Sequence, residues 1–553
     1  MKKQLKGCQI IVECLLEQGV EYVFGYPGGQ IIDTFDALYE KRGQIKQILT
    51  AHEQGASHAA DGYARVSGKP GVVIATSGPG ATNLVTGIAN AYMDSIPLIA
   101  ITGNVPVPLL GRDSFQEVDI AGITMPITKH NYIVKDVKKL AETIREAFEI
   151  AMSGRRGPVL IDVPKDVQQA VCDFQTVAPV STKISLDETQ DFETAAKMID
   201  EAKRPYLFVG GGCVASGASA EAVALAEKLN APVCSSVMGL GAFPSSHPLF
   251  AGLVGMHGSA AVADTLGKCD LMIALGARFS DRVAQNRNSF MAGAKILHID
   301  VDDAEIDKNV RSHAHLKGDV KAVLSALLPR VGRKAETAWA SEVASQAKKH
   351  PFRPVGKTLC PRKVIECVRS RVSDDTPIAT DVGQHQMWVA QSYRFERGRT
   401  FVTSGGLGTM GFGMGAAIGA ALAAKKAPVL FTGDGSLHMN LNEIPTAVKY
   451  GLGVKIFLFN NNVLGMVRQW QTLFYGGRYS STVLNLPTDY EALAKAFGAK
   501  AFTLSRNEDI EKVVGAALET DGTVLVNCII DKDDMVLPMI PPGKAMGDII
   551  EEI

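Results

Sequence analysis

Residues 429–470 read VLFTGDGSLHMNLNEIPTAVKYGLGVKIFLFNNNVLGMVRQW. The apolar runs Val429–Thr432 and Val454–Phe459 predict two buried strands, and the spacing of apolar residues in Leu441–Tyr450 predicts a helix between them. Two parallel strands that are joined by a helix end at the same edge of a sheet, which is where open α/β folds bind ligands. We therefore expect a ligand site where these two strands end.

Oxygen-bearing side chains and glycines follow both predicted strands. The tetrapeptide GDGS (residues 433–436) follows the first strand, and NNN (residues 460–462) follows the second. Either group alone is a common turn sequence. Together at one sheet edge, the carboxylate and amide oxygens suit a Mg²⁺ ion that holds a diphosphate. The glycines would let backbone N–H groups approach the phosphates.

The composition describes a soluble globular chain long enough for three domains. It has 553 residues, a formal net charge of −1 and no basic block, so nucleic acid is an unexpected partner. No run of 18 or more apolar residues predicts a membrane span, and the apolar N-terminal run is interrupted by Glu13, as in a helix rather than a signal peptide. Nine cysteines without a CxxC pair indicate reduced thiols and a cytoplasmic location.

The GDG motif, followed about 25 residues later by NN, is the signature of thiamine diphosphate enzymes. The segments NNxxxGMVxQWQ and FYxxRYS resemble the catalytic subunit of the acetohydroxyacid synthase (acetolactate synthase) family. This resemblance implies that Asp434, Asn461 and the carbonyl group of Val463 bind Mg²⁺. It further implies that the cofactor is contacted by Gly433, Gly435, Ser436, Gly465 and Met466. Trp470 would border the acceptor pocket, although its spacing from Val467 equally fits a core aromatic.

Residues 1–170 alternate short apolar runs with helical patterns, which predicts a doubly wound α/β domain. The predicted strands are Tyr22–Tyr26, Ile48–Ala51, Val72–Thr76, Leu98–Gly103 and Val159–Val163. Glycine-rich loops follow two of them, at residues 26–29 (YPGG) and 77–83 (SGPGATN), and each could be only a tight turn. Glu53 follows the strand at 48–51, where an isolated acid is usually a solvated group at a helix start.

Three segments in this domain match the pyrimidine-binding domain of the thiamine family in order: HEQGAxHxAxGYAR, SGKPGV and TSGPGATN. The resemblance implies that the Glu53 carboxyl group hydrogen-bonds N1′ of the aminopyrimidine, with Gly29 also in the catalytic region. Cofactor contacts are implied for Tyr26, Pro27, Gly28, Pro79 and Asn83. The matches GRDSFQE, TKHN and PKDV imply that Phe115 and Gln116 line the substrate channel and that Lys165 lies near the mouth of that channel. For Lys165, a role as an ordinary surface residue is equally open.

Residues 171–189 have no clear period and are interpreted as a linker, and residues 190–330 predict a second α/β domain. Its predicted strands are Tyr206–Val209, Leu271–Leu275 and Ile296–Asp300, and the glycine triplet at 210–212 is not a full dinucleotide fingerprint. The resemblance implies FAD in this domain, with one departure: residues 166–189 contain no arginine, which the family usually supplies from its linker. The implied FAD contacts are Gly211, Gly212, Ser236, Val237, Met238, Met256, His257, Gly276, Arg278, Arg282, Asp300, Val301, Asp319 and Val320.

A polar connector with a helix at Ala335–His350 leads to a third α/β domain at residues 361–530, which is followed by a tail at 531–553. A predicted strand at Ile378–Asp381 precedes Val382, Gly383, Gln384 and His385, the family's site for the diphosphate end of the cofactor. Residues 406–411 satisfy GxGxxG, but the acid expected to bind a nicotinamide ribose, Asp434, lies within GDGS instead. The family resemblance places Gly408 beside the thiamine and Met410 under its bend, and the tail over the active site.

The resemblance therefore implies three doubly wound parallel-sheet domains with thiamine diphosphate, Mg²⁺ and FAD. The activity is decarboxylation of pyruvate and transfer of the hydroxyethyl group to pyruvate or 2-ketobutyrate, in branched-chain amino-acid biosynthesis. A homodimer or homotetramer is implied, with a regulatory small subunit as a separate chain. The alternatives are an FAD-independent catabolic acetolactate synthase, a pyruvate oxidase, and a non-catalytic binding protein, which Glu53, Asp434 and Asn461 argue against. The acceptor preference and the feedback inhibitor stay open.

Overall fold

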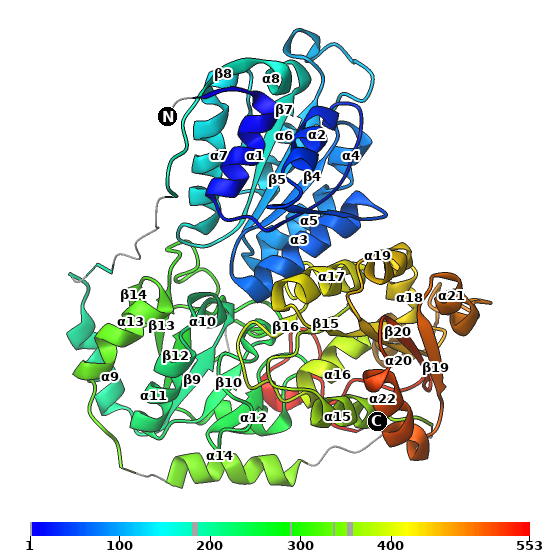
Figure 1. Ribbon diagram of the computed structural model, residues 1–553. Coiled ribbons are helices and arrows are strands. Elements are labelled where there is room, and N and C mark those ends of the chain that lie inside the picture. The colour runs from blue at the N-terminus through cyan, green and yellow to red at the C-terminus, as the bar shows by residue number, and fades with distance from the viewer. Residues whose placement is uncertain are drawn as a thin grey trace.

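The computed structural model describes residues 3–179, 186–187, 189–287, 290–335, 338–350 and 358–552. Within them the chain forms three α/β units, each built on a six-stranded sheet (Figure 1). All strand pairs in the three sheets are parallel. The predicted fold class is thereby confirmed.

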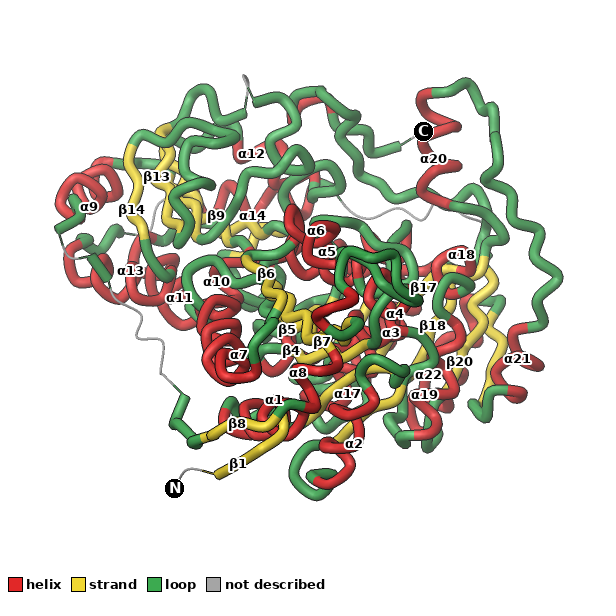
Figure 2. Tube along the Cα trace, turned by 90° about the horizontal axis from the view of Figure 1, so that it is seen from above, coloured by secondary structure: helices red, strands yellow, loops and turns green. Residues whose placement is uncertain are grey.

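The N-terminal unit packs helices on both faces of its sheet. One face is covered by α1, α2 and α7 and the other by α3 and α5, so the strands lie between two helix layers (Figure 2). The strands are β2 (Tyr22–Tyr26), β3 (Lys46–Leu49), β4 (Gly71–Ala75), β5 (Leu98–Asn104), β6 (His130–Ile133) and β7 (Pro158–Pro164). The helices are α1 (Gly7–Glu17), α2 (Ile32–Glu40), α3 (Glu53–Ser67), α4 (Pro79–Thr82), α5 (Val85–Asp94), α6 (Ile120–Thr124), α7 (Val137–Met152) and α8 (Lys165–Gln169).

Three strands of this unit were not predicted, and β3 begins and ends two residues before its predicted bounds of 48–51. The edge strand β6 was not predicted, because its four residues are exposed or half-buried and lack an apolar run. The linker prediction for residues 171–189 was wrong at its start. Strand β8 (Val171–Phe174) pairs antiparallel with β1 (Lys3–Lys6), a pairing between two short segments far apart in the chain that no local pattern signals.

The central unit has the same layered construction. Its strands are β9 (Pro205–Val209), β10 (Val233–Ser235), β11 (Phe250–Leu253), β12 (Leu271–Leu275), β13 (Lys295–Asp300) and β14 (Ala314–Lys317). Its helices are α9 (Phe192–Glu201), α10 (Gly211–Ser216), α11 (Ser219–Leu229), α12 (Ala260–Leu266) and α13 (Val320–Leu327), followed by α14 (Ala338–Lys349). Helices α12 and α14 cover one face and the others cover the opposite face.

The C-terminal unit contains the two strands that were predicted from residues 429–470. Its strands are β15 (Ile378–Thr380), β16 (Phe401–Val402), β17 (Val429–Gly433), β18 (Lys455–Asn460), β19 (Lys500–Leu504) and β20 (Val524–Ile529). Its helices are α15 (Pro361–Arg371), α16 (Gln384–Ser392), α17 (Phe412–Ala424), α18 (Asp434–Leu437), α19 (Ile444–Lys449), α20 (Gly465–Phe474), α21 (Tyr490–Ala496) and α22 (Ile510–Glu519). Strands β17 and β18 are neighbours in the sheet, so their carboxyl ends share an edge as expected.

The order of the strands shows where each sheet opens to a ligand. The outer sheets run β3-β2-β4-β5-β7-β6 and β16-β15-β17-β18-β20-β19, the same order when strands are counted within each sheet, and the central sheet runs β11-β10-β9-β12-β13-β14. The winding reverses between β2 and β4, between β15 and β17, and between β9 and β12. Ligands bind at such switch points in open α/β sheets, and the predicted glycine-rich loops follow these strands.

The two outer units pack against each other through helices α3 and α17 (Figure 1). Glycines make the approach close: a Cβ atom on Gly62 would lie 2.2 Å from the carbonyl oxygen of Ala416, and one on Gly419 would lie 1.8 Å from that of Ala59. Their buried residues belong to one apolar core that joins both units. The geometry of one outer unit is therefore tied to that of the other within the same chain.

Two further expectations concern the whole chain. All nine cysteines are free, and eight are buried while Cys172 is half-buried, which agrees with reduced thiols. Among the described residues, none of the helices combines the length and the hydropathy needed to cross a membrane.

A buried acid in the N-terminal sheet gives a prediction about stability. Asp162 on β7 is fully buried and accepts hydrogen bonds from Thr102 Oγ1 (2.6 Å) and Asn104 Nδ2 (2.5 Å) on β5. Burial raises the pKa of Asp162 to about 7, although these two hydrogen bonds oppose the shift. An unfolded aspartate has a pKa of about 4, so between about pH 4 and 7 the folded chain binds more protons and loses stability as pH rises.

Asp162→Asn is therefore expected to gain stability relative to the unmodified chain as pH rises from 5 to 8. Only the two units from pH 5 to 7 fall within this window, so the gain is at most about 3 kcal/mol. The introduced amide can replace both contacts, because its NH₂ group can donate to the Thr102 hydroxyl while its carbonyl oxygen accepts from Asn104. The measurement is the difference in melting temperature between the two cofactor-free chains at each pH. A constant difference from pH 5 to 8 would contradict the assignment.

Candidate active site

A pocket opens at the switch point of the C-terminal sheet, between the ends of β15 and β17. Thirteen of the predicted site residues line it: Val382, Gly383, Gln384, His385, Met410, Gly433, Asp434, Gly435, Ser436, Asn461, Val463, Gly465 and Met466. Five further lining residues were not predicted: Trp388, Phe459, Leu464, Val467 and Ile530. Trp388 lies one helical turn after Gln384 on α16, a spacing that could have suggested it, whereas Ile530 comes from a distant segment that carries no such signal.

Asp434 has the properties of a cation ligand. It is the first residue of α18 and is buried, and its Oδ1 accepts a hydrogen bond from the N–H of Gly435 at 3.0 Å. Its Oδ2 is buried and has no hydrogen-bond partner among the described residues. Burial raises the pKa of Asp434 to about 6. A buried carboxylate oxygen without a partner destabilises the folded chain unless a cation or a hydrogen-bond donor binds it.

Two other oxygens are available near this carboxylate. Asn461 follows β18 and its Oδ1 accepts from the N–H of Val463 at 3.2 Å, so these two residues are fixed relative to each other. Asp434, Asn461 and Val463 all line the pocket. The described residues contain no cluster of three His, Cys, Asp or Glu side chains that could hold a metal. A metal here would be held by one carboxylate, one amide and one carbonyl group, a donor set that fits Mg²⁺.

Close approach of the backbone explains the glycines around this pocket. A Cβ atom on Gly465 would lie 2.0 Å from Gln384 Oε1, and one on Gly435 would lie 2.7 Å from a Leu464 methyl group. His385 is also buried, with its Nε2 atom unpartnered among the described residues, and burial lowers its pKa to about 3. This imidazole is therefore neutral at physiological pH and offers the pocket a hydrogen bond rather than a charge.

Glu53 lies in the N-terminal unit among the residues predicted to accompany it. It begins α3, and its Oε2 accepts a hydrogen bond from Asn83 Nδ2 at 3.0 Å. A Cβ atom on Gly80 would lie 3.3 Å from Glu53 Oε1, and one on Gly28 would lie 2.5 Å from the Thr76 side chain. The loops that follow β2 and β4 thus meet beside this carboxyl group, at the switch point of the N-terminal sheet.

An unpredicted acid from the C-terminal unit fixes the backbone next to Glu53. Glu443 is fully buried, and its carboxylate accepts hydrogen bonds from the N–H groups of Ala51 (3.0 Å) and His52 (3.0 Å). Burial raises the pKa of Glu443, although these bonds oppose the shift. The contact joins residues about 390 positions apart, which is why sequence patterns did not reveal it.

The predicted substrate-channel residues are near the N-terminal site. Lys165 Nζ donates a hydrogen bond to the carbonyl oxygen of Gly29 at 2.8 Å, so two predicted catalytic residues are in contact. Phe115 is 84% exposed, and the Gln116 backbone lies against Gly78. Trp470 is half-buried on α20, with its ring 5.7 Å from that of Phe474, and packs against Met256, Leu537 and Met539. It does not line the C-terminal pocket.

The residues around Glu53 in the N-terminal unit and the residues that line the C-terminal pocket do not meet within one chain. Every described residue that lines the pocket belongs to the C-terminal unit. The last of them along the chain is Ile530, which follows the unit's last strand. Glu53, Asn83 and the loops of the N-terminal unit are absent from the pocket lining.

The residues predicted to bind FAD lie at or after the carboxyl ends of the six strands of the central sheet. Gly212, after β9, and Gly276, after β12 with φ +59°, are in contact: a Cβ atom on Gly276 would lie 2.5 Å from the Gly212 Cα. Ser236 Oγ accepts from the N–H of Gly239, and Asp319 caps α13 at Val320, after β14. His257 is half-buried, but its Nε2 atom is buried and unpartnered among the described residues, and desolvation lowers its pKa to about 4.

Arginines from outside the predicted linker reach this region. Arg155 Nη1 lies 2.6 Å from Glu305 Oε1, and burial lowers the pKa of Arg156 while Asp319 opposes that shift. Arg278 Nη1 donates to the carbonyl oxygen of Met93 at 2.8 Å, and Arg282 contacts Met256. The central unit therefore has arginines from the N-terminal unit at its border, although residues 166–189 contain none.

Comparison with known proteins adds three family matches and full-length relatives. Residues 5–123, 192–327 and 381–528 match the N-terminal TPP binding domain, the central domain and the C-terminal TPP binding domain of the thiamine pyrophosphate enzymes. A probable acetolactate synthase large subunit of Methanocaldococcus jannaschii is 44% identical, over 99% of this chain and 96% of that protein. The Escherichia coli K12 acetolactate synthase large subunits of isozymes 1 and 2 are 44% and 42% identical, over 100% and 99% of this chain and 98% and 100% of theirs.

Proposed function

We propose an activity for this chain on the ground that it belongs to the thiamine pyrophosphate enzymes, and among them to the acetolactate synthase large subunits. The chain is an acetolactate synthase that uses thiamine diphosphate. It decarboxylates pyruvate and joins the remaining two-carbon unit to a second 2-keto acid, either pyruvate or 2-ketobutyrate. The observation that carries the proposal is the pocket at β17 and β18, where buried Asp434 has an unpartnered oxygen beside Asn461.

Mg²⁺ is proposed as the ion that binds the diphosphate in this pocket. Asp434, Asn461 and the Val463 carbonyl group would bind it. The ion would then be the partner of the Asp434 oxygen that has none among the described residues. A Cβ atom on Gly433, Gly435 or Gly465 would crowd a neighbouring side chain of the pocket. Because these residues have no side chain, phosphate oxygens could approach their backbone N–H groups. Thiamine diphosphate, when bound, supplies an acidic carbon that adds to the keto group of pyruvate and stabilises the electron pair left by CO₂.

Glu53 is proposed as the acid that holds a proton at N1′ of the aminopyrimidine. Its Oε2 is oriented by Asn83, and Glu443 fixes the backbone on its N-terminal side. Because Glu53 does not line the pocket of its own chain, we propose a homodimer in which a second copy brings its N-terminal unit to that pocket. Exposed Tyr26, Ile32 and Phe115 on the same unit are consistent with a surface that another copy covers.

FAD is proposed for the central unit. The contact between Gly212 and Gly276 brings the loops that follow β9 and β12 together at the switch point, where a pyrophosphate would bind, and the unpartnered His257 nitrogen and the nearby arginines fit a polar ligand. A separate small regulatory subunit is proposed as a partner, because the similar proteins are named large subunits.

Product analysis tests the activity. The chain with Mg²⁺, thiamine diphosphate and pyruvate should form acetolactate, and added 2-ketobutyrate should divert product to acetohydroxybutyrate. The flavin absorption spectrum of the same sample distinguishes the FAD-independent catabolic synthase, and reduction of oxygen or a quinone during turnover distinguishes a pyruvate oxidase. Absence of CO₂ release from pyruvate would favour a non-catalytic binding protein.

Trp470→Leu is expected to keep acetolactate formation but to shift the product ratio away from acetohydroxybutyrate. 2-Ketobutyrate exceeds pyruvate by one methylene, which an apolar pocket distinguishes by about 10–200-fold. The half-buried indole of Trp470 extends from α20 and packs against Leu537 and Met539 of the tail. It would provide part of that contact. The measurement is competition with both acceptors present, since donor decarboxylation is common to both products. Phe474→Leu, the next aromatic on α20, is the matched control. An unchanged ratio in active Trp470→Leu would assign this side chain to packing alone.

A further inference from the structure

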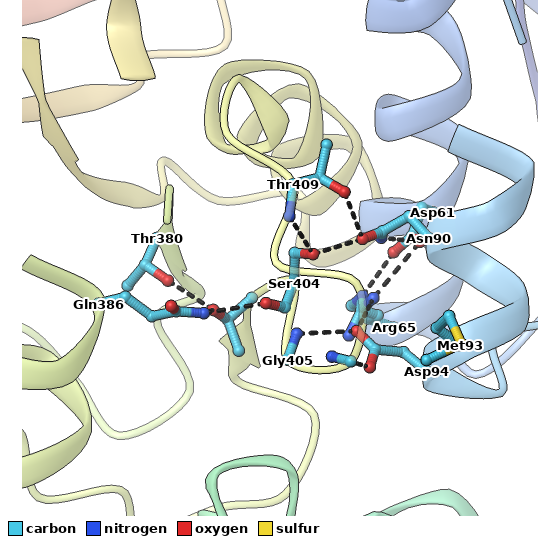
Figure 3. Close-up of polar contacts among 12 residues, drawn as sticks. Asp61, Arg65, Asn90, Met93, Asp94, Thr380, Gln386, Ser404, Gly405 and Thr409 are labelled. Carbon is cyan, nitrogen blue, oxygen red and sulfur yellow. Dashed lines mark hydrogen bonds and ion pairs between the residues drawn. The ribbon is translucent and has the colours of Figure 1, made fainter. Parts of the chain in front are cut away.

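A cluster of polar side chains in the N-terminal unit contacts the loop that carries Met410. We call residues 404–411 the glycine loop, and we call Asp61, Arg65, Asn90 and Asp94 the Arg65 cluster (Figure 3). The side chain of Asp94 is fully buried at the end of α5. Its Oδ2 accepts the N–H of Gly405 at 3.0 Å, and its Oδ1 accepts the N–H of Gly406 at 2.7 Å. One carboxylate thus binds two successive backbone donors of the other unit.

Arg65 holds this carboxylate in place. Its Nη2 donates to Asp94 Oδ2 at 2.9 Å, and its Nε donates to Asp61 Oδ1 at 2.5 Å, with only 4% of the Arg65 side chain exposed. Burial lowers the pKa of Arg65, but the two carboxylates outweigh it and raise the pKa above the ordinary value. The guanidinium group therefore keeps its charge and compensates both acids, which a buried anion requires.

Asn90 joins the two ends of the glycine loop. Its Oδ1 accepts from Ser404 Oγ at 2.5 Å and from Thr409 Oγ1 at 3.2 Å, and its Nδ2 donates to Asp61 Oδ2 at 2.9 Å (Figure 3). Ser404 Oγ in turn accepts from the N–H of Thr409 at 2.9 Å. The loop is therefore closed at its base by side chains of the N-terminal unit, while residues 405–408 are exposed or half-buried.

The glycines of the loop are needed for this approach. A Cβ atom on Gly406 would lie 2.8 Å from Asp94 Oδ1 and 3.0 Å from the Met93 carbonyl oxygen. Gly408 has φ +71° and Gly411 has φ +87°, a region that favours glycine. Met410 lies between them, lines the pocket, and reaches to 3.6 Å from the position of a Cβ atom on Gly435. The shape of the loop therefore determines where Met410 stands in the pocket.

We propose that Asp94, held by Arg65, is a positioning residue for the cofactor site of its own chain: it fixes the glycine loop, and with it Met410, before thiamine diphosphate binds. This inference rests on the proposed function, because it takes the pocket to be the thiamine site. A loop that is ordered in advance does not have to be ordered when the cofactor binds, so affinity and orientation are gained together. Asp94 lies about 310 positions from the loop it holds.

Asp94→Asn tests the proposal, because it retains the size of the side chain but leaves only one oxygen for two backbone donors. In the cofactor-free chain, hydrogen–deuterium exchange of residues 404–411 should accelerate by roughly 10–100-fold, as expected for the loss of a charge-assisted hydrogen bond. Thiamine diphosphate at fixed Mg²⁺ should bind about tenfold more weakly or worse. Ser404→Ala, a smaller change that leaves the Arg65 cluster intact, should show the same two effects to a lesser degree.

Asp270→Asn is the matched control, since the Asp270 carboxylate also accepts two successive backbone N–H groups, those of Lys203 and Arg204, at the opposite end of a strand from the central site. It should leave exchange in residues 404–411 and thiamine diphosphate affinity unchanged.

Three results would overturn the proposal. The first is an unchanged exchange rate of the glycine loop in folded Asp94→Asn. The second is an exchange rate that rises equally throughout α3 and α17, which would indicate a purely structural role. The third is faster exchange of the glycine loop with unchanged affinity for thiamine diphosphate. Failure of the unmodified chain to bind thiamine diphosphate would instead contradict the proposed function, because the exchange measurement uses no cofactor.

Discussion

An Asp434→Ala chain is expected to lose the Mg²⁺-dependent retention of thiamine diphosphate. Asp434 is the one acidic side chain among the described residues that line the C-terminal pocket. Loss of a group that only orients a metal ligand typically costs about 10–100-fold in metal affinity, so loss of the anionic ligand should exceed roughly 100-fold. Asn461 and the Val463 carbonyl group carry no charge and cannot compensate for it.

The measurement is a titration of cofactor-free protein with thiamine diphosphate at several Mg²⁺ concentrations. The unmodified chain should bind more tightly as Mg²⁺ rises, and Asp434→Ala should show little dependence on the ion. The variant should remain folded, because burial raises the pKa of Asp434 to about 6 and the charged form is therefore disfavoured in the cofactor-free protein. Normal affinity in the folded variant would mean that the metal lies elsewhere.

The strands that decide the fold were predictable from local sequence. Apolar runs located β2 and β12 to the residue and β17 and β18 to within one residue at each end, because strands buried on both faces read as continuous apolar segments. Strands at exposed edges, such as β6 and β8, carry no such signal. Motifs after the buried strands likewise identified most of the C-terminal pocket, since the ends of parallel strands meet at one edge.

The contacts between the units could not be predicted in this way. Glu443 contacts Ala51 and His52, and Asp94 contacts Gly405 and Gly406, across about 390 and 310 positions. Each of these acids lies in or next to a helix, where a single carboxylate is normally interpreted as a solvated residue. Only the packing of α3 on α17 brings them to backbone N–H groups of the other unit.

This packing gives both halves of the proposed cofactor site a support from the other outer unit of the same chain. Glu443 of the C-terminal unit fixes the backbone that leads into Glu53, and Asp94 of the N-terminal unit fixes the loop that leads into Met410. In the proposed homodimer, Glu53 and Met410 of one chain would serve different pockets. A change at the α3–α17 contact is therefore expected to affect both pockets of the dimer.

Glu53→Gln is expected to leave folding and thiamine diphosphate binding nearly intact while it slows removal of the cofactor's C2 proton by roughly 10²–10⁴-fold. The residues proposed to hold the diphosphate and Mg²⁺ all lie in the C-terminal unit. Asn83 Nδ2 can donate to the glutamine carbonyl oxygen as it does to Glu53 Oε2. The amide group can then still donate a hydrogen bond to N1′ of the pyrimidine, but it has no acidic proton to transfer.

The experiment that isolates this step is exchange of the C2 proton in deuterated solvent, stopped with acid and read by proton NMR, beside a binding titration of the same protein. Glu21→Gln is the matched control, because Glu21 lies in the same unit immediately before β2, at the opposite end of that strand from the candidate site. The Glu21→Gln chain should exchange the C2 proton at the unmodified rate.

If Glu53→Gln also exchanges at that rate while it binds the cofactor normally, Glu53 has no part in proton removal. If both binding and exchange fail, the carboxylate is needed to hold the cofactor. Slow exchange with normal binding, which we expect, would assign Glu53 to the proton transfer itself.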